Sequence, residues 1–398
     1  MTIRRVTPDD GFNYIHTYFT KSPYHPDNVR LLYCKFKTHD GPGYICVLDT
    51  RTGSETVLAS VANPDYHNAA QQNWCDNGNK IVYKKTTETI AVYDLATGVE
   101  TEVTAQLSSY SDNSDYLLEV DGDFPLDEQH AMGLYLRDVR HLENRRRLVT
   151  IDELFSAHPA CADIKNARIR LRLGGQISPD KKTVILYLVS RVGTLVRDYF
   201  LFDLASSRIV YHGPLGQHIM WHPNSRDIYS FVRSGKTLAG EFPERWGADP
   251  YLHPYGKLGR YDVETREFAL VSDHRIEGSA HVSPSPDGTK VAIDSIRYRG
   301  MSILLFDIRS GEMNTICTHD NFLRERGCPA EKTRFAPTVG QYYAESARRL
   351  DKTDGALDAR HEKSHIKVNP HPVFSPDGSR IVFNSNETEY CHIYEAVF

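Results

Sequence analysis

The sequence predicts an all-β fold, a seven-bladed β-propeller with four-stranded blades, and two repeated signals carry this prediction. The first is a tight-turn motif that recurs seven times along the chain. The second is a short apolar strand that ends in an acidic residue, and it also recurs seven times. Paired turn and strand signals repeated at this spacing are typical of propeller blades. Helical stretches are few, which agrees with an all-β chain.

The turn motif combines proline, asparagine, aspartate and glycine. Proline presets one turn dihedral, and Asn, Asp and Gly tolerate the positive φ that closes a tight hairpin. In chain order the motifs are His25–Asn28, Cys75–Gly78, Val120–Asp123, Ser178–Lys181, His222–Ser225, Ser285–Gly288 and Ser375–Gly378. After most of them comes a strand of β-forming residues, namely Val29–Tyr33, Lys80–Tyr83, Thr183–Leu188, Asp227–Phe231, Lys290–Ile293 and Arg380–Phe383. Each motif is therefore expected to mark one blade, with its histidine, where present, in a structural role.

The acid-ended strands come next in each repeat. They are Tyr44–Asp49, Ile90–Asp94, Leu134–Asp138, Tyr199–Asp203, Leu258–Asp262, Ile303–Asp307 and Cys391–Glu395. Several continue through Thr-Gly or Ser-Gly into one more strand. The last blade shows only three strands, and we expect the N-terminal strand Ile3–Val6 to pair in it as the fourth. Such pairing closes the ring and removes exposed sheet edges.

The blades account for the whole chain, so we expect residues 1–398 to form a single propeller domain. By length alone, 398 residues would allow two or three ordinary domains or one large repeat domain. Unequal spacing between the motifs predicts insertions at about 104–115, 236–257 and 320–364, the last with helical character over 339–350. Long insertions on a rigid scaffold are usually functional or disordered.

Composition excludes several classes of protein. Hydrophobic residues make up 40% and charged residues 25%, as in globular proteins. The net charge of −5 lacks the positive excess that is typical of proteins that bind nucleic acid. The N-terminus lacks a secretory apolar region, and no apolar run reaches the roughly 18 residues of a membrane span. We therefore expect a cytoplasmic protein. The seven cysteines are odd in number and form no CxxC pair, which favours free thiols.

The segments that precede the last two turns contain a candidate site for a divalent metal. Asn369 and His371 lie two residues apart, so on a strand both side chains point to one face. His281 precedes the sixth turn, and because blades six and seven are neighbours, His281 and His371 are expected to converge near the channel mouth. Two imidazoles and an amide oxygen suit a borderline divalent metal. The alternative is that these histidines hydrogen-bond neighbouring blades.

Other polar residues flank the remaining turns and are expected to line the channel. They are His16, Tyr18 and Lys21 in the first blade, His67, Asn68 and Gln72 in the second, and Gln176, Arg191, Arg197, Gln217, His218 and Arg233 in the fourth and fifth. Such a ring would suit an anionic, hydroxyl-rich ligand, because arginine grips a carboxylate with two hydrogen bonds. Solvent-lined channel polarity without a ligand is the alternative. The sequence has no GxSxG elbow, Walker loop or HExxH motif.

Two stretches resemble the cytoplasmic oligogalacturonate lyases. Phe12–Tyr33 is similar to their opening blade, and Asn369–Gly378 is similar to their final blade, including its His-Pro before the turn. In that family, one histidine of the sixth blade and a glutamine and two histidines of the last hold a manganese ion. His281 and His371 match two of these ligands. Asn369 stands where another histidine is expected, and Ile366 where the glutamine is expected.

The resemblance implies a polysaccharide lyase that cleaves short uronate oligosaccharides from pectin, above all oligogalacturonate, by β-elimination. A metal ion or an arginine would neutralise the carboxylate, and a neutral histidine would remove the C5 proton. We assign His218 as the base and Arg233 as its catalytic partner, with substrate contacts from His16, Tyr18, Arg191, Arg197, Gln217 and Arg260. The alternative is a non-catalytic TolB- or WD40-like propeller that binds a protein or peptide. The sequence does not predict the oligomeric state.

Overall fold

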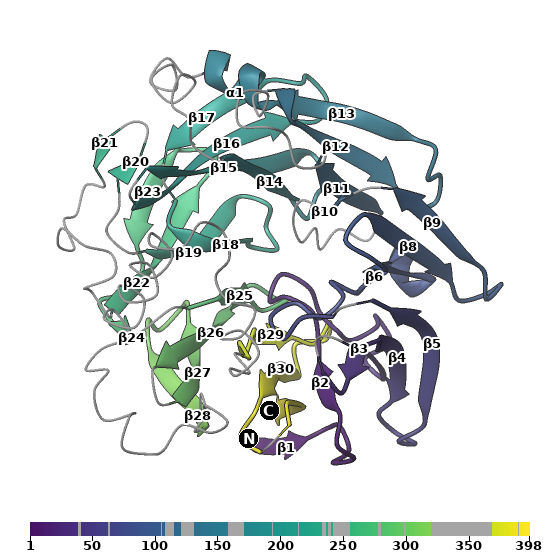
Figure 1. The fold of residues 1–398 in the computed structure, drawn as a ribbon. Helices are drawn as coiled ribbons and strands as arrows, with labels where there is room; N and C mark the ends of the chain where they lie inside the picture. Colours follow the sequence, from purple (N-terminus) through teal and green to yellow (C-terminus); the bar gives the residue numbers. More distant parts are fainter. Residues whose placement is uncertain are drawn as a thin grey trace, which may run out of the picture.

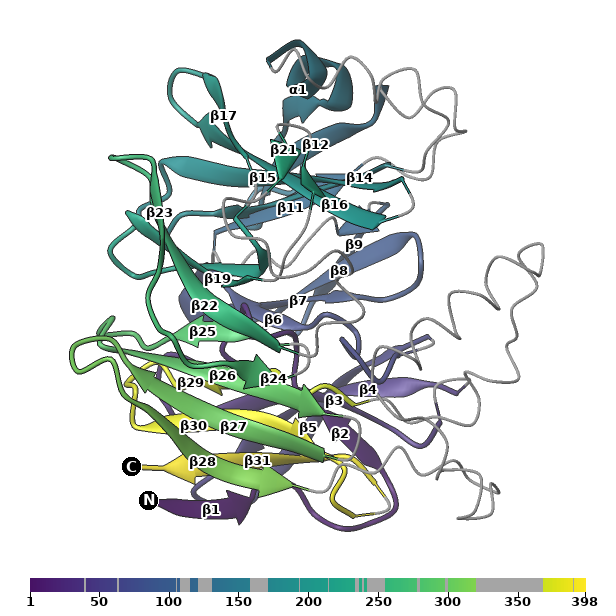
Figure 2. The ribbon, with the colours of Figure 1, turned by 90° about the vertical axis from the view of Figure 1, so that its left-hand side faces the viewer.

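A computed structural model shows the fold. It describes residues 1–38, 41–62, 64–104, 106–107, 115–120, 131–157, 171–192, 194–213, 215–232, 236–237, 240–241, 255–277, 280–297, 300–319, 368–388 and 390–398. Within these ranges, seven antiparallel sheets, each with a path of four strands, follow one another around a ring (Figure 1). The side view in Figure 2 shows the same blades edge on. The predicted fold class, a seven-bladed β-propeller, is confirmed.

The first three blades occupy the N-terminal part of the chain, and in each the strands are paired in sequence order. Blade 1 contains β2 (Asn13–Ile15), β3 (Arg30–Phe36), β4 (Gly43–Asp49) and β5 (Glu55–Val61). Blade 2 contains β6 (Asn73–Cys75), β7 (Lys80–Lys84), β8 (Thr89–Asp94) and β9 (Glu100–Thr104). Blade 3 contains β10 (Gln106–Leu107), β11 (Tyr116–Val120), β12 (Gly133–Asp138) and β13 (Arg145–Thr150), followed by the short helix α1 (Ile151–Ala157).

The remaining blades repeat this pattern. Blade 4 contains β14 (Leu171–Ile177), β15 (Thr183–Val192), β16 (Thr194–Asp203) and β17 (Ile209–Gly213). Blade 5 contains β18 (Gln217–Trp221), β19 (Asp227–Val232), β22 (Tyr255–Asp262) and β23 (Glu267–Leu270), with β24 (Ile276–Glu277) beside β22. Blade 6 contains β25 (Val282–Pro284), β26 (Lys290–Arg297), β27 (Gly300–Asp307) and β28 (Met313–His319). Blade 7 contains β29 (Val373–Phe374), β30 (Arg380–Ser385) and β31 (His392–Val397).

The N-terminal strand completes blade 7, as the sequence predicts. Strand β1 (Thr2–Arg5) pairs antiparallel with β31, and both chain ends lie together in Figures 1 and 2. The buried carboxylate of Glu395 on β31 accepts hydrogen bonds from Arg4 Nε and, at 2.7 Å, from the Tyr24 hydroxyl of blade 1. The ring is thus closed by backbone pairing and by one carboxylate that joins three segments.

The hydrophobic core lies between the blades. Seven clusters of buried side chains occur among the described residues, and each joins neighbouring blades. Strand β7 shows how one strand serves two clusters, since alternate side chains point to opposite faces of a sheet. Ile81 and Tyr83 pack toward blade 1, whereas Val82 packs toward blade 3. This two-sided packing explains why the blade strands are apolar at consecutive positions.

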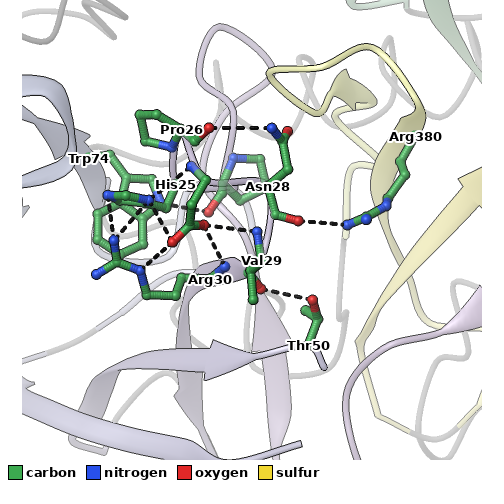
Figure 3. A network of polar contacts seen from close by, with 10 residues as sticks. His25, Pro26, Asn28, Val29, Arg30, Thr50, Trp74 and Arg380 are labelled. Atoms are coloured by element: carbon green, nitrogen blue, oxygen red, sulfur yellow. Dashed lines mark hydrogen bonds and ion pairs between the residues drawn. The ribbon is translucent and has the colours of Figure 1, made fainter. Parts of the chain in front are cut away.

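The turn motifs also join neighbouring blades, as Figure 3 shows for the first of them. His25 Nδ1 accepts the backbone N–H of Asp27 at 3.0 Å, and its ring lies 5.0 Å from that of Trp74 in blade 2. Asn28 adopts φ 60°, and its carbonyl accepts a hydrogen bond of 3.1 Å from Arg380 in blade 7. The turn therefore contacts the blades on both of its sides.

Most turn motifs connect the first two strands of a blade, but the third does not. Val120 ends β11, the second strand of blade 3, so this motif follows that strand instead of preceding it. Asp121–Asp123 lie outside the described residues. In the other blades the turn motif connects the first two strands. In blade 3 that position is the β10–β11 connection, which falls in the expected insertion at 104–115. The motif at Val120 belongs instead to the connection between β11 and β12.

The other expected insertions fall largely outside the described residues. Of 236–257, the structure describes the pair β20 (Lys236–Thr237) and β21 (Gly240–Glu241) and the start of β22. All of 320–364, including the expected helix, lies outside. Across the described ranges, no helix combines the length and apolar character needed to cross a membrane. The cysteines described, Cys34, Cys46, Cys75, Cys317 and Cys391, are free thiols.

Candidate functional site

Four imidazoles gather at the axis of the ring. His67 belongs to the β5–β6 connection and His218 to β18, while His281 and His371 directly precede the inner strands β25 and β29. The ring centroid of His281 lies 4.2 Å from that of His218 and 4.4 Å from that of His371. The centroid of His67 lies 4.8 Å from that of His371. His281 and His371 thus meet as the sequence predicts, and we call the four residues the histidine cluster.

The segment that follows β2 inserts two aromatic side chains into the histidine cluster. The ring of Tyr18 lies 4.6 Å from that of His371, and it contacts His67 and His281 as well. Phe19 is buried, with its ring 4.8 Å from His281 and 6.0 Å from His218. Because Phe19 reaches blades 5 and 6 from blade 1, it fills space on the axis with an apolar ring. Tyr18 and the half-buried rings of His67 and His218 form the more open part of the cluster.

The backbone is bent at two of the histidines. His218 has φ 51° and His371 has φ 49°, a left-handed conformation that is unfavourable for residues with a Cβ atom. Each lies four residues before the first residue of its turn motif, at the inner end of the blade. In β18 the strand register shifts between Gln217 and Met220, which marks a bulge around His218. Bulges re-aim side chains and are common beside active sites, so local strain here directs both imidazoles toward the axis.

Hydrogen bonds fix the orientation of two of the imidazoles. His218 Nδ1 lies 2.7 Å from the carbonyl oxygen of Ala280, and because a carbonyl accepts only, Nδ1 carries the proton. The lone pair of His218 is therefore on Nε2. Asn369 Nδ2 donates to His67 Nδ1 at 2.8 Å, which places the lone pair of His67 on Nδ1. His218 thus has the tautomer that a general base requires at Nε2.

Burial keeps the deepest histidines neutral. His16, on the segment after β2, is fully buried, and this lowers its pKa to about 3, although the carbonyls of Pro370 and Thr17 favour the protonated form. Burial also lowers the pKa of His371 well below its usual value, and the neighbouring histidines His281 and His67 lower it further. A neutral imidazole can accept a proton or bind a metal, whereas an imidazolium can do neither.

His371 and Asn369 present polar atoms that have no partner in the described part of the protein. Both ring nitrogens of His371 and the Oδ1 of Asn369 are buried and make no hydrogen bond. Buried polar atoms in native proteins are almost always paired, because an unpaired one costs about 1–3 kcal/mol. Buried unpaired atoms also occur on the segment after β2, at the hydroxyls of Thr17 and Thr20, so these two segments are the candidate contacts for a polar ligand.

The segment that contains Asn369 and His371 supplies two of the three predicted metal ligands. No group of three or more His, Cys, Asp or Glu side chains placed to share a metal ion occurs in the described ranges. The predicted ligands His281, Asn369 and His371 comprise two imidazoles and one amide, and Ile366, which stands at the expected glutamine position, lies outside those ranges. The unpaired nitrogens of His371 and the unpaired Oδ1 of Asn369 are donor types that divalent cations accept.

The structure does not bring all the predicted residues to the cluster. Arg260 lies on β22, the third strand of blade 5, with its Nε 3.8 Å from Asp227 Oδ1. Gln217 precedes His218 on β18 and is half-buried. Gln176 donates to the carbonyl of Ile219 and so joins blades 4 and 5. The side chains of Arg191 and Arg197, near the tip of the β15–β16 hairpin, and the whole of Arg233 lie outside what is described.

Sequence reasoning missed two residues of the site, Phe19 and Asp294. Asp294 is a fully buried carboxyl on β26 that contacts His281. A signal for it exists, since an acid stands inside the apolar run Lys290–Ile296, where a buried strand rarely carries one. No comparable signal exists for Phe19, because an aromatic residue next to an inner strand is usually part of the core.

Comparisons with known proteins place the fold. No protein-family model and no curated protein sequence matches the chain. The structure of an oligogalacturonate lyase in complex with manganese matches with a TM-score of 0.66 and 16% identity, over 100% of this chain and 93% of that one. An oligogalacturonate lyase from Vibrio parahaemolyticus matches with a TM-score of 0.64 and 16% identity, over 99% of this chain and 93% of that one. A chain of a mitotic checkpoint complex matches with a TM-score of 0.50 and 11% identity, over 100% of this chain and 91% of that one. The resemblance seen in the sequence is thus confirmed at the level of the fold.

Proposed function

We propose that this propeller, which shares its fold with oligogalacturonate lyases along the whole chain, is a lyase acting on short uronate oligosaccharides, with oligogalacturonate as the preferred substrate. The reaction is β-elimination. The proposal includes the cytoplasmic location expected from the sequence.

The observation that carries the proposal is the histidine cluster on the axis. Imidazoles from the β5–β6 connection and from blades 5 and 7 lie within 6.4 Å of His281 of blade 6, measured between ring centroids. A structural core does not require neutral imidazoles with buried, unpaired nitrogens such as those of His371. Proton abstraction next to a carboxylate does require a neutral base beside groups that stabilise negative charge.

In the proposed reaction, His218 acts as the base. Its Nε2 takes the C5 proton, the C5–H electron pair forms the C4–C5 double bond, and the bond from C4 to the glycosidic oxygen breaks. The leaving oxygen then takes a proton from water, and the hydroxide that remains takes the proton from Nε2, which restores the neutral base. The Nδ1 proton of His218, donated to the carbonyl of Ala280, keeps the lone pair on Nε2 until the C5 proton is transferred. Tyr18 contacts the sugar from the blade 1 side, whereas His16, the other contact expected there, is fully buried in this structure.

The C5 proton becomes acidic only when the carboxylate charge is neutralised. We assign this role to Arg233, with Arg191, Arg197 and Gln217 as further substrate contacts from blades 4 and 5. Arg260, held near Asp227 on the third strand of its blade, would serve only a substrate that extends over that blade. Guanidinium groups suit a uronate because they bind a carboxylate through two parallel hydrogen bonds.

A divalent cation, manganese by analogy with the lyase structure solved with that ion, would be held by His281, Asn369 and His371. The unpaired nitrogens of His371 and the unpaired Oδ1 of Asn369 support this assignment. When bound, the ion would supply positive charge for the uronate carboxylate. Metal analysis of the purified protein, repeated on His371→Ala, tests the assignment. An equal metal content in both proteins would contradict it.

The decisive experiment follows ultraviolet absorbance while the protein is incubated with oligogalacturonides, with and without manganese. Elimination yields a 4,5-unsaturated sugar, which absorbs where the intact substrate does not. We expect absorbance to rise with the wild type. In His218→Ala the rate of this rise should be at least about 100-fold lower, since a positioned general base contributes about 10²–10⁴-fold to the rate.

A matched control is available on the same hairpin. His222 also hydrogen-bonds a backbone carbonyl, that of Gly288 at 2.9 Å, but it lies in the turn, away from the histidine cluster. His222→Gln should therefore retain the rate of the wild type. If absorbance fails to rise with any uronate in a substrate panel, the lyase proposal is wrong and a propeller that binds a protein or peptide partner becomes the better interpretation.

A further inference from the structure

A single buried carboxyl contacts two members of the histidine cluster. Asp294 Oδ1 accepts the backbone N–H of His281 at 2.6 Å, and Asp294 Oδ2 lies 2.8 Å from His281 Nδ1. The same Oδ2 accepts the backbone N–H of His371 at 3.3 Å. Asp294 is 0% exposed, and it lies on β26 of blade 6, whereas His371 belongs to blade 7. The carboxyl therefore joins the inner segments of two blades at the site.

The next blade repeats this bracing with an amide. Asn384 occupies on β30 the place that Asp294 occupies on β26, the fifth residue of the strand. Its Oδ1 accepts the backbone N–H of His16 at 3.1 Å, and its Nδ2 donates to the carbonyl of Asn369 at 3.3 Å. Asn384 shows that an amide is sufficient to hydrogen-bond backbone groups of two blades. Asp294 also faces an imidazole nitrogen, so hydrogen bonds to the backbone do not by themselves explain why position 294 is an acid.

We propose that Asp294 is a positioning residue of the site, which orients His281 through Nδ1, holds its Nε2 lone pair toward the axis, and sets the left-handed backbone of His371. This inference rests on the proposed function only for its catalytic consequence, because the geometry exists whatever the ligand. A carboxylate that receives the second ring N–H of a functional histidine fixes the tautomer and the ring orientation.

The substitution Asp294→Asn separates these roles. In the variant, the amide oxygen takes the place of Oδ1, because it can accept the backbone N–H of His281, which makes the shortest of the three contacts. The amide Nδ2 then faces His281 Nδ1, and as a donor it forces Nδ1 to accept and moves the ring proton to Nε2. Size and the hydrogen bond from the His281 N–H are preserved while the tautomer is reversed, as with the Asp-to-Asn change described for serine protease triads. The N–H of His371, which Oδ2 accepts in the wild type, loses its acceptor in this variant.

The test is ¹⁵N NMR of the full-length, metal-free protein with labelled histidine, recorded at pH 9. We expect the Nδ1–H tautomer of His281 in the wild type and the Nε2–H tautomer in Asp294→Asn. Asp307→Asn is the matched control, since Asp307 is on the same blade and also accepts two backbone N–H groups, those of Arg309 and Ser310. It should leave the His281 signals unchanged.

Lyase activity provides the second measurement. We expect Asp294→Asn to lower the rate on oligogalacturonides about 10- to 100-fold, the usual cost of losing such a partner. An Nε2–H tautomer in the wild type, or an unchanged tautomer in Asp294→Asn, would overturn the proposal. The wild-type spectrum decides the matter alone if the variant does not fold. If the wild type cleaves no uronate, the proposed function fails while the NMR result still decides the role of Asp294.

Discussion

At the scale of single residues, the site combines strain with unsatisfied polarity. His371 has a left-handed backbone and a fully buried ring whose nitrogens have no partner among the described residues. Each feature costs of order 1–3 kcal/mol, and the rest of the blade must offset both. Proteins tolerate such costs at positions where function requires a particular side chain in a particular direction.

A pair of substitutions at His371 separates function from strain. His371→Ala and His371→Gly both remove the imidazole and should abolish lyase activity. Glycine adopts φ 49° without steric penalty, whereas alanine retains the penalty, so we expect His371→Gly to be more stable than His371→Ala by about 1 kcal/mol. Urea unfolding measures the difference. Activity that survives in either variant would remove His371 from the site, and a more stable alanine variant would refute the strain argument.

At the scale of elements, the turns of neighbouring blades interlock. His222 Nε2 donates to the carbonyl of Gly288 in the next turn, and a Cβ atom at Gly288 would lie 2.5 Å from the His222 ring. His25 stands in the same relation to Gly78 in the turn of blade 2. The histidine of one turn therefore packs where the next turn has no side chain, and this contact fixes the spacing of adjacent blades at the turn end.

Gly288→Ala should therefore destabilise the protein by more than the backbone penalty alone. Gly288 has φ +70°, and Gly311, on the same blade, has φ +74° with no atom within 4 Å of its ideal Cβ position. Gly311→Ala should cost about 1 kcal/mol, which is the left-handed penalty. Gly288→Ala should cost about 2–4 kcal/mol, because the His222 ring must also move. Equal losses in thermal or urea unfolding would show that the turns do not interlock tightly.

The elements differ in how far the sequence predicts them. Turns and acid-ended strands are local signals, so blades, strand order and the closing strand β1 could all be predicted. The convergence of His281 and His371 follows from the adjacency of blades 6 and 7. The bulge that re-aims His218 and the insertion of Phe19 depend on backbone dihedrals and on packing across the axis. These features leave no local pattern, and without them the sequence could not show which polar residues reach the site.

At the scale of the whole molecule, buried titratable groups make stability depend on pH. The pKa of His16 is about 3 in the folded protein, against about 6.5 when unfolded, and burial lowers the pKa of His371 in the same direction. Below pH 6.5 the unfolded chain binds protons that the folded protein does not, so stability falls as pH decreases. Asp294 acts in the opposite sense, because burial raises its pKa to about 8. Its contribution is fully present below pH 4 and is lost as pH rises through 8.

We therefore expect the free energy of unfolding to be greatest near pH 6.5. His25, His319 and His392 also have lowered pKa values, so the histidines outweigh the one carboxyl and the free energy of unfolding falls from pH 6 to pH 5. In Asp294→Asn the opposing contribution disappears, so the loss between pH 6 and 5 should become steeper and the decline above pH 6.5 should become smaller. Urea titrations of the metal-free proteins from pH 5 to 9 provide the measurement. A free energy that stays level or rises from pH 6 to 5 would contradict the assignment of neutral, buried histidines.

The pairing of β1 with β31 also dictates when this protein can finish folding. During synthesis Thr2–Arg5 leave the ribosome before every other described strand and His392–Val397 after all of them, so the earliest strand waits for the partner that is made last among the strands of the ring. Until then Glu395 has not met Arg4, and blade 7 cannot form. Until β31 has been synthesised, nascent chains therefore carry an incomplete ring with open sheet edges.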